Sequence, residues 1–390
     1  MDNLSLLLEK IHAVLPDIID LRHQLHQIPE IGLKEYKTSA RIRKYLEELG
    51  LPILPPVLDT DVTAILKGDR SGPTILLRAD IDALPIEEAT GVPYSSTHPS
   101  IAHSCGHDGH MAILLGTAKV LTQMREQIAG TVKFLFQPAE ESEAGARLMV
   151  KAGYLEQEPK ATEAYALHGW PGIPIGSVES CSGPILAAIN NFEIFLTGSG
   201  GHGAVPEKAV DLLGAVSSFI FDMKQVVSRL NTPDNPVIIS VCAVNGGNTY
   251  NVFPQRVILK GTVRFLQDET GLKVKAAIKK SLDKNVLSIG GQYRIETPTP
   301  DYVSTCNDET IFKKVTDVAV KYLGKERWNG RASYNMGGED FGFILQKVPG
   351  VYFRVGMGED YPYLHNPTFN FNDEAIETGI LMMCGLVLER

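Results

Sequence analysis

The sequence His103-Ser104-Cys105-Gly106-His107-Asp108-Gly109-His110 stands directly before an apolar run, Met111 to Met124, whose periodicity predicts a helix. Thiol and imidazole groups are preferred ligands of first-row transition metals, and alternate residues of a loop broken by glycine can converge on one ion. The dipole of the following helix would favour the thiolate of Cys105. This octad therefore predicts part of a metal site.

Strand-like and helical runs alternate on both sides of the octad. The expected strands are 62–66, 74–78, 131–136, 164–168 and 351–355. The expected helices, besides 111–124, are 4–29, 37–49, 145–152, 309–323 and 373–388. This alternation is typical of an α/β domain with a mixed, mostly parallel sheet.

Residues 188–298 follow a different order, in which a strand, a helix, two strands, a helix and a strand succeed one another. The expected strands are 191–197, 237–244, 256–266 and 292–297, and the helices are 211–230 and 269–288. This order is that of a ferredoxin-like α+β unit. We therefore expect an inserted domain at 188–298 and a metal-binding catalytic domain formed by 1–187 and 299–390.

Composition excludes several classes of protein. The net charge of −9, without a run of lysine or arginine, argues against a nucleic-acid surface. No stretch approaches the roughly 20 apolar residues of a membrane span. The short apolar run with an acidic flank at Met1–Glu9 does not match a signal peptide, and five scattered cysteines form no disulfide framework. We expect a cytoplasmic chain.

Paired carboxylates follow two of the predicted strands, at the edge where open α/β sheets bind ligands. Asp80 and Asp82 come after 74–78, and one of them could bind a metal or hold the second nitrogen of a ligating histidine. Glu140 and Glu141 come after the next strand. Because adjacent side chains diverge, one glutamate can ligate a metal while the other acts as a general base.

Two further histidines extend the set of candidate ligands. His168 ends a predicted strand, and His365 lies in a loop near the C-terminus. With Cys105, His107 and Glu141 they make five ligands, too many for one catalytic zinc ion with an open position but suited to two metals that share a ligand. The sequence therefore predicts a binuclear centre of zinc, manganese, nickel or cobalt.

The inserted domain contributes candidate substrate contacts. His202 stands alone in the glycine-rich run Gly198–Pro206, where it could donate to a developing oxyanion. Arg264, on a predicted strand, suits a substrate carboxylate, because a guanidinium binds a carboxylate through two hydrogen bonds. Asn251 could add another hydrogen bond to the same group.

Together these motifs resemble the binuclear metallo-amidohydrolases and carboxypeptidases that include aminoacylases, hippurate hydrolases and auxin-conjugate (IAA-amino acid) hydrolases. The resemblance runs nearly from end to end. It is carried by Arg22-His23-Gln24-Leu25-His26 with Pro29-Glu30, Leu77 to Pro85, His103 to His110, Gln137 to Glu141, Gly201-His202, Glu339-Asp340-Phe341 and Leu364-His365-Asn366.

The resemblance implies that Cys105 bridges two divalent metal ions. The other ligands would be His107, Glu141, His168 and His365. Glu140 would be the general base that activates the attacking water, and it would later protonate the leaving amine.

The resemblance also implies roles outside the ligand set. His202 would steady the tetrahedral intermediate from the neighbouring subunit of a homodimer or higher homo-oligomer that meets through the inserted domain, which would also serve as a lid. Asn251 and Arg264 would hold the substrate carboxylate. Asp82 would stand behind a ligating histidine.

The sequence thus predicts a metal-dependent enzyme that cleaves the amide bond of N-acyl-L-amino acids of the N-acetyl or N-benzoyl type. A metallocarboxypeptidase or dipeptidase is the alternative, because both kinds of substrate present an amide beside a free carboxylate. Two further readings are a non-catalytic, metal-dependent binding protein and a cysteine-nucleophile enzyme that uses Cys105 and His107. Chelators would leave the last of these active.

Overall fold

A computed structural model describes residues 3–389 of the chain, which form two compact units. The first unit holds the residues up to Ile185, together with Thr305–Ser333 and those from Asp340 onward. The second unit holds Leu186–Ser304 and Tyr334–Glu339, and is thus inserted into the first. Met1 and Asp2, at the start of the stretch that argues against a signal peptide, lie outside the described residues.

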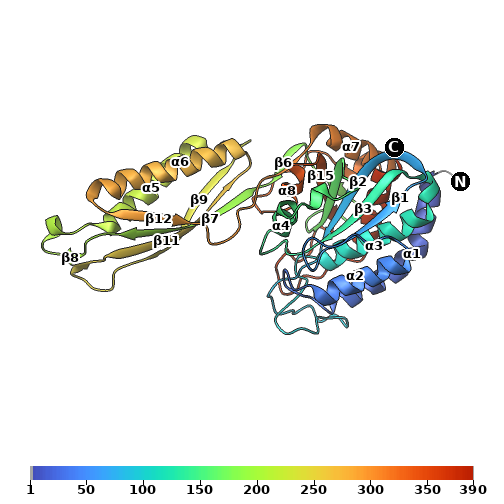
Figure 1. Cartoon of the computed structure of the whole chain (residues 1–390), viewed down its shortest axis with the longest axis horizontal. Coiled ribbons are helices and arrows are strands. Elements are labelled where there is room, and N and C mark those ends of the chain that lie inside the picture. Colours follow the sequence, from blue (N-terminus) through green and yellow to red (C-terminus); the bar gives the residue numbers. More distant parts are fainter. Residues whose placement is uncertain (1–2, 390) are drawn as a thin grey trace. The chain divides into compact units, whose positions relative to one another are not determined.

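The first unit is built on a seven-stranded sheet with the order β1-β3-β2-β4-β15-β5-β14 (Figure 1). The strands are β1 (Val62–Lys67), β2 (Arg70–Asp80), β3 (Ala129–Gln137), β4 (Glu163–Trp170), β5 (Val178–Glu179), β14 (Trp328–Asn329) and β15 (Gly350–Gly356). Neighbours are parallel except in the β1–β3 and β15–β5 pairs. The expected α/β class with a mixed, mostly parallel sheet is confirmed.

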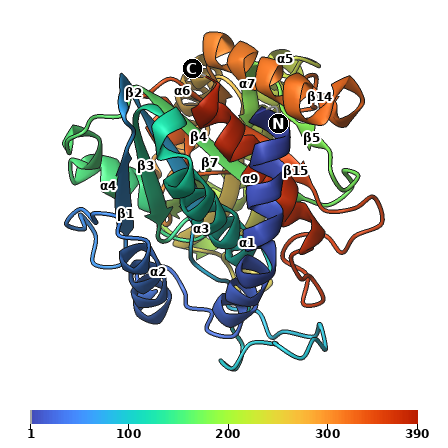
Figure 2. The ribbon, with the colours of Figure 1, turned by 90° about the vertical axis from the view of Figure 1, so that its right-hand side faces the viewer.

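The helix that follows the octad lies at the centre of the helical layer. The helices of the first unit are α1 (Asn3–His26), α2 (Tyr36–Glu48), α3 (His107–Gln123), α4 (Gly145–Lys151), α7 (Glu309–Leu323), α8 (Gly342–Leu345) and α9 (Glu374–Leu388). Figure 2 shows α1, α3 and α9 side by side on the sheet, and α3 contacts both helices as well as β2. No helix in the described part of the chain combines the length and the apolar character that a membrane crossing requires.

The second unit has the strand and helix order that the sequence predicts. Its elements are β7 (Ala188–Thr197), α5 (Leu212–Leu230), β9 (Val237–Asn245), β11 (Arg256–Phe265), α6 (Asp268–Asn285) and β12 (Gln292–Glu296). The sheet has the order β12-β7-β11-β9 and is antiparallel throughout. The helices α5 and α6 cover one of its faces (Figure 1), where alternate residues of β7 such as Phe192 and Ile194 are buried.

The structure differs from the sequence prediction at the octad and in its shortest strands. Helix α3 begins at His107 rather than Met111, so half of the octad lies in the first turn of a helix. Gly106 makes this early start possible, because its φ of 92° is a left-handed conformation that glycine adopts readily and that lets the chain turn directly into the helix. The strands β5, β6 (Gly183–Leu186), β13 (Thr305–Asn307) and β14 have two to four residues each, too few to show a periodicity.

Candidate metal centre

The five candidate ligands reach one edge of the first unit's sheet from four places in the chain. Cys105 directly precedes Gly106, and His107 opens α3. Glu141 follows the end of β3, and His168 belongs to β4. His365 comes from the loop between β15 and α9.

These side chains form two sets that share Cys105. In one set Cys105, His107 and His168 each offer an atom within 4.8 Å of the others, and in the second Cys105, Glu141 and His365 do the same. The sulfur of Cys105 lies 3.3 Å from His168 Nε2, and His365 Nε2 lies 3.3 Å from Glu141 Oε1. This grouping is the one that a thiolate between two ions requires.

One candidate ligand atom, His107 Nε2, is buried and has no hydrogen-bond partner among the described residues. His107 Nδ1 donates to the main-chain oxygen of Asp82 at 2.9 Å, which leaves Nε2 for another ligand. A buried polar atom without a partner costs about 1–3 kcal/mol, and a bound cation removes that cost. The residues therefore fit a metal.

The carboxylates around the candidate centre favour the binding of positive charge. Burial lowers the pKa of His107, but Asp80, Asp82 and Glu141 outweigh burial and raise that pKa to about 10. Metal-free, the imidazole would thus be protonated at neutral pH. A bound metal ion supplies the same positive charge and leaves the nitrogen as a ligand.

Cys105 and His168 show the effect of burial most directly. Burial, helped by the charges of Glu141 and Glu140, raises the pKa of the Cys105 thiol well above its usual range. In the metal-free chain, burial and these carboxylates thus oppose any effect of the α3 dipole on this thiol. Burial lowers the pKa of His168 well below its usual range, and Nδ1 of its neutral ring donates to Gly169 O at 2.8 Å. The lone pair of Nε2 is thus available to a metal.

Asp80, the last residue of β2, and Asp82 form different hydrogen bonds. Asp82 accepts from Glu141 N at 3.0 Å through Oδ2, and its Oδ1 lies 3.3 Å from His107 Nδ1, so it supports two candidate ligands. Asp80 instead lies 2.6 Å from His110 Nδ1 and accepts from Arg78 at 2.7 Å. His110 Nε2 accepts from the main chain of Gly169 at 2.9 Å, which leaves His110 in a supporting position.

The motif from Arg22 to His26 holds the octad from the neighbouring helix. Arg22 Nη1 and His26 Nδ1, one turn apart on α1, lie 3.0 Å and 2.8 Å from the same oxygen of Asp108. Asp108 is fully buried in the first turn of α3. His103 is buried beside this cluster, and burial lowers its pKa to about 3. It is a neutral packing residue.

Glu140 lies beside the candidate ligands and follows a residue with a left-handed backbone conformation. Its side chain is only 7% exposed, and Glu140, Glu141 and His107 each offer an atom within 4.8 Å of the others. The preceding residue, Ala139, has a φ of 57°, and the ligand His365 has a φ of 62°. Residues other than glycine keep such left-handed conformations only where the surrounding contacts enforce them.

The second unit brings two of its three candidate contacts together. His202 lies in the short strand β8 (Gly201–His202), which pairs with β10 (Val252–Phe253) directly after Asn251. The Nδ1 atom of His202 accepts from Ala204 N at 3.1 Å, so a neutral ring carries its proton on Nε2. Arg264 donates to Met336 O at 2.7 Å, near the far end of β11. The residues from Arg256 to Arg264 span ~26 Å of strand, which separates Arg264 from Asn251.

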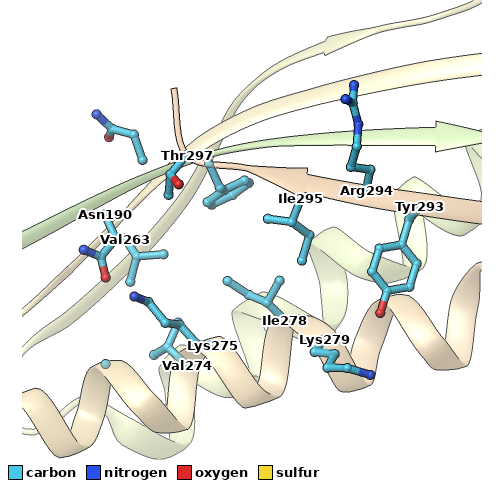
Figure 3. Close-up of a pocket in the computed structure, with 13 residues that line it drawn as sticks. Asn190, Val263, Val274, Lys275, Ile278, Lys279, Tyr293, Arg294, Ile295 and Thr297 are labelled. Atoms are coloured by element: carbon cyan, nitrogen blue, oxygen red, sulfur yellow. The ribbon is translucent and has the colours of Figure 1, made fainter. Parts of the chain in front are cut away.

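The second unit also contains a cavity of about 490 Å³ between α6 and the sheet (Figure 3). Its lysines already have acidic partners, since Lys275 contacts Asp301 and Lys279 contacts Asp283. The apolar wall is formed by Phe192, Val263, Val274, Ile278 and Ile295. Among residues 3–389, none of the potential metal-binding groups includes a residue of this cavity, so it is distinct from the candidate centre.

A buried thiol, three imidazoles and paired glutamates at the edge of a mostly parallel sheet define a metal-dependent hydrolase. Residues 76–389 match the model of peptidase family M20/M25/M40. The chain therefore belongs to this family, and the resemblance seen in the sequence is confirmed. Within the family it is a metal-dependent amidohydrolase.

Three relatives show how closely the chain matches. It is 38% identical over 362 residues to the N-acetyl-L-cysteine deacetylase of Bacillus subtilis, covering 92% of this chain and 84% of that one. It is 34% identical over 386 residues to IAA-amino acid hydrolase ILR1-like 2 of Arabidopsis thaliana, covering 96% and 86%. The crystal structure of the Bacillus subtilis YXEP protein, a dinuclear metal-binding peptidase of the M20 family, superposes with a TM-score of 0.84 at 32% identity, covering 97% and 98%.

Proposed function

We propose that the chain hydrolyses the amide bond of N-acyl-L-amino acids of the N-acetyl or N-benzoyl type. The observation that carries this proposal is the buried carboxylate of Glu140 beside two ligand sets that share one thiol. A deacetylase of N-acetyl-L-cysteine and a hydrolase of IAA-amino acids among the relatives support the substrate class. The products would be an amino acid and a carboxylic acid.

The five ligands would hold two divalent ions, with Cys105 between them. Zinc, manganese, nickel and cobalt all suit this mixture of sulfur, nitrogen and oxygen. When bound, the ions would polarise the substrate carbonyl and lower the pKa of water. The unpartnered Nε2 atom of His107, the two groups of candidate ligands and the dinuclear relative support this assignment.

Glu140 would carry the proton in this reaction. Its carboxylate would take a proton from the attacking water and deliver it to the nitrogen of the leaving amine. Asp82 would support the step indirectly, because it holds both Glu141 and His107 in place.

His202, Asn251 and Arg264 would bind the substrate. His202 would donate its Nε2 proton to the developing oxyanion, and the Nδ1 contact with Ala204 keeps the ring in that tautomer. Because Asn251 and Arg264 lie far apart in one second unit, their binding to the same carboxylate requires two copies of the chain.

We infer that these copies form a homodimer through the second unit, which would also serve as the lid. Of the thirteen large hydrophobic residues exposed in the described part of the chain, eleven belong to this unit, among them Phe221 and Leu272. Sedimentation analysis should give the mass of a dimer.

We also propose that the chain works in the reducing cytoplasm. The five cysteines form no disulfide bonds, which supports this proposal.

One screen tests the function. The metal-loaded chain is offered N-acetyl, N-benzoyl and N-succinyl amino acids alongside dipeptides, with zinc, manganese, nickel and cobalt in turn. We expect hydrolysis of the N-acetyl or N-benzoyl substrates to exceed that of dipeptides. Faster cleavage of dipeptides would instead assign a carboxypeptidase, and no hydrolysis at full metal loading would leave a binding protein.

A further inference from the structure

The turn from Pro138 to Gly145 carries both Glu140 and Glu141, and its backbone is unusual at both ends. Ala139 has a φ of 57° and Ala144 a φ of 52°, so two alanines adopt a conformation that usually belongs to glycine. The carbonyl of Ala139 accepts from Gly145 N at 2.9 Å, which closes the turn. Something outside the turn must hold Ala139 in this conformation.

The residue that contacts Ala139 from outside the turn is Glu35, which is fully buried and directly precedes α2. Glu35 occupies the N-cap position of α2, yet its side chain makes no capping hydrogen bond. Its Oε1 accepts from Ala139 N at 2.9 Å, and its Oε2 accepts from Thr60 Oγ1 at 2.8 Å. The carboxylate therefore acts on the turn of Glu140 rather than on its own helix.

The segment that bears Glu35 fits closely against the same turn. A Cβ atom at Gly32 would lie 2.9 Å from both Ala139 Cβ and Ser142 Oγ, so only glycine permits this approach. The nearby Glu30 accepts from the main-chain nitrogens of Lys37 and Thr38, each at 2.9 Å. This second glutamate supplies the cap of α2, which leaves Glu35 for Ala139.

Two other carboxylates hold Glu141 and the residue that follows the turn. Asp82 accepts from Glu141 N at 3.0 Å, and Asp340 accepts from Ala146 N at 2.8 Å. Glu35 thus binds the Pro138–Ala139 amide, one residue before Glu140. Rotation of that peptide would redirect the Glu140 side chain without removing a metal ligand.

We propose that Glu35 is a positioning residue for Glu140: by accepting from Ala139 N it fixes the left-handed turn that aims the Glu140 carboxylate at the metal centre. This inference rests on the proposed role of Glu140 as the general base. Two carboxylates would then position two neighbouring residues of one turn: Asp82 would hold the candidate ligand Glu141, and Glu35 would hold the proposed base Glu140.

The test compares Glu35→Ala and Glu35→Gln in the full-length, metal-loaded chain. Because a displacement of ~1 Å costs about 100-fold in rate, we expect Glu35→Ala to lower kcat about 100-fold with little change in KM. Metal content should stay that of the wild type. Hydrogen exchange of the peptide 137–146 should become faster, which reports the loss of the Ala139 contact without reference to activity. Glu35→Gln should restore most of kcat, because its amide oxygen can still accept from Ala139 N.

Asp308 provides a matched control. It too is a carboxylate at the N-cap of a helix, and its Oδ1 accepts from the main-chain nitrogen of Ile311 at 2.9 Å, in a segment without candidate site residues. Asp308→Ala should destabilise the chain and leave kcat unchanged. Equal kcat values for Glu35→Ala and Asp308→Ala, or a loss of metal in Glu35→Ala, would overturn the inference.

A third variant keeps the test decisive if Glu35→Ala does not fold. Thr60→Val removes only the second contact of Glu35, so we expect a decrease of about 5-fold in kcat, and an unchanged kcat would count against the inference. Failure of the proposed function has a different outcome. In that case the wild-type chain itself hydrolyses no N-acyl amino acid.

Discussion

At the scale of single residues, Glu140 and Glu141 are neighbours with different expected roles. Glu140→Gln should keep both metal ions, because Glu140 is not among the five ligands, while kcat falls about 10²–10⁴-fold with the loss of the base. Steady-state kinetics and metal analysis on one preparation measure the two effects. The exposed Glu143 gives the control, since Glu143→Gln changes the same charge on the same turn. Normal turnover of a metal-loaded Glu140→Gln protein would contradict the mechanism.

His26 makes the stability of the metal-free chain depend on pH. Burial lowers the pKa of His26, but Asp108 outweighs burial and raises the pKa to about 9. The folded chain therefore holds a proton that the unfolded chain releases near pH 6.5. This stabilisation is complete below pH 6.5 and is lost as the pH rises through 9.

Urea unfolding of the metal-free chain at pH 6.5 and pH 9 measures this effect. We expect the free energy of unfolding to fall by up to about 3 kcal/mol more in the wild type than in His26→Gln, because the raised pKa of His107 contributes to the fall in both proteins. His26→Gln should be less stable at pH 6.5 and should show a smaller fall. An unchanged pH dependence in His26→Gln would assign the proton to another group.

At the scale of elements, two glycines of α3 lie closely against side chains of neighbouring segments, with different expected consequences. A Cβ atom at Gly109 would lie 2.2 Å from the ring of Phe371, whereas one at Gly116 would lie 2.5 Å from Ile380 Cδ1, the end of a flexible side chain. Gly109→Ala should lower the free energy of unfolding by about 1–3 kcal/mol. Gly116→Ala should be close to neutral, because the higher helix propensity of alanine, worth about 1 kcal/mol, offsets a contact that can adjust. Urea unfolding measures both variants, and equal losses of unfolding free energy in Gly109→Ala and Gly116→Ala would contradict this difference.

The long elements could be predicted because their buried faces repeat over many residues. The helix α7 spans the predicted residues 309–323, and the order of strands and helices in the second unit is the predicted one. The start of α3 was missed because Gly106 and Gly109 make the octad resemble a loop. Strands such as β5, with two residues, carry no period at all.

The candidate ligands could be proposed from side-chain chemistry, but the residues that support them could not be predicted. Glu35 precedes an amphipathic helix and has the sequence context of an ordinary N-cap. Its partner Ala139 lies 104 residues away, and Asp340 lies 203 residues from its partner Gln137. Nothing local in the sequence marks such contacts. They follow only from the fold.

At the scale of the whole molecule, all five candidate ligands belong to the first unit. Removal of metal with a chelator should therefore abolish hydrolysis and lower the unfolding temperature of the first unit, because metal binding stabilises the state that binds it. Calorimetry with and without chelator measures the shift. Hydrogen exchange in α5 and α6 should stay the same, and activity that survives complete metal removal would revive a nucleophilic role for Cys105.

The position of the second unit between Cys105 and His365 has a consequence for synthesis. About 260 residues separate these two candidate ligands in the chain. At ~5–20 residues per second, a ribosome needs on the order of 13–50 s to reach His365 after it has made Cys105. The nascent chain thus presents four of the five ligands while the last one does not yet exist. If the proposed ligand sets hold two ions, one ion would have its three ligands before translation ends, and the second set would be complete only after the C-terminal segment has been made.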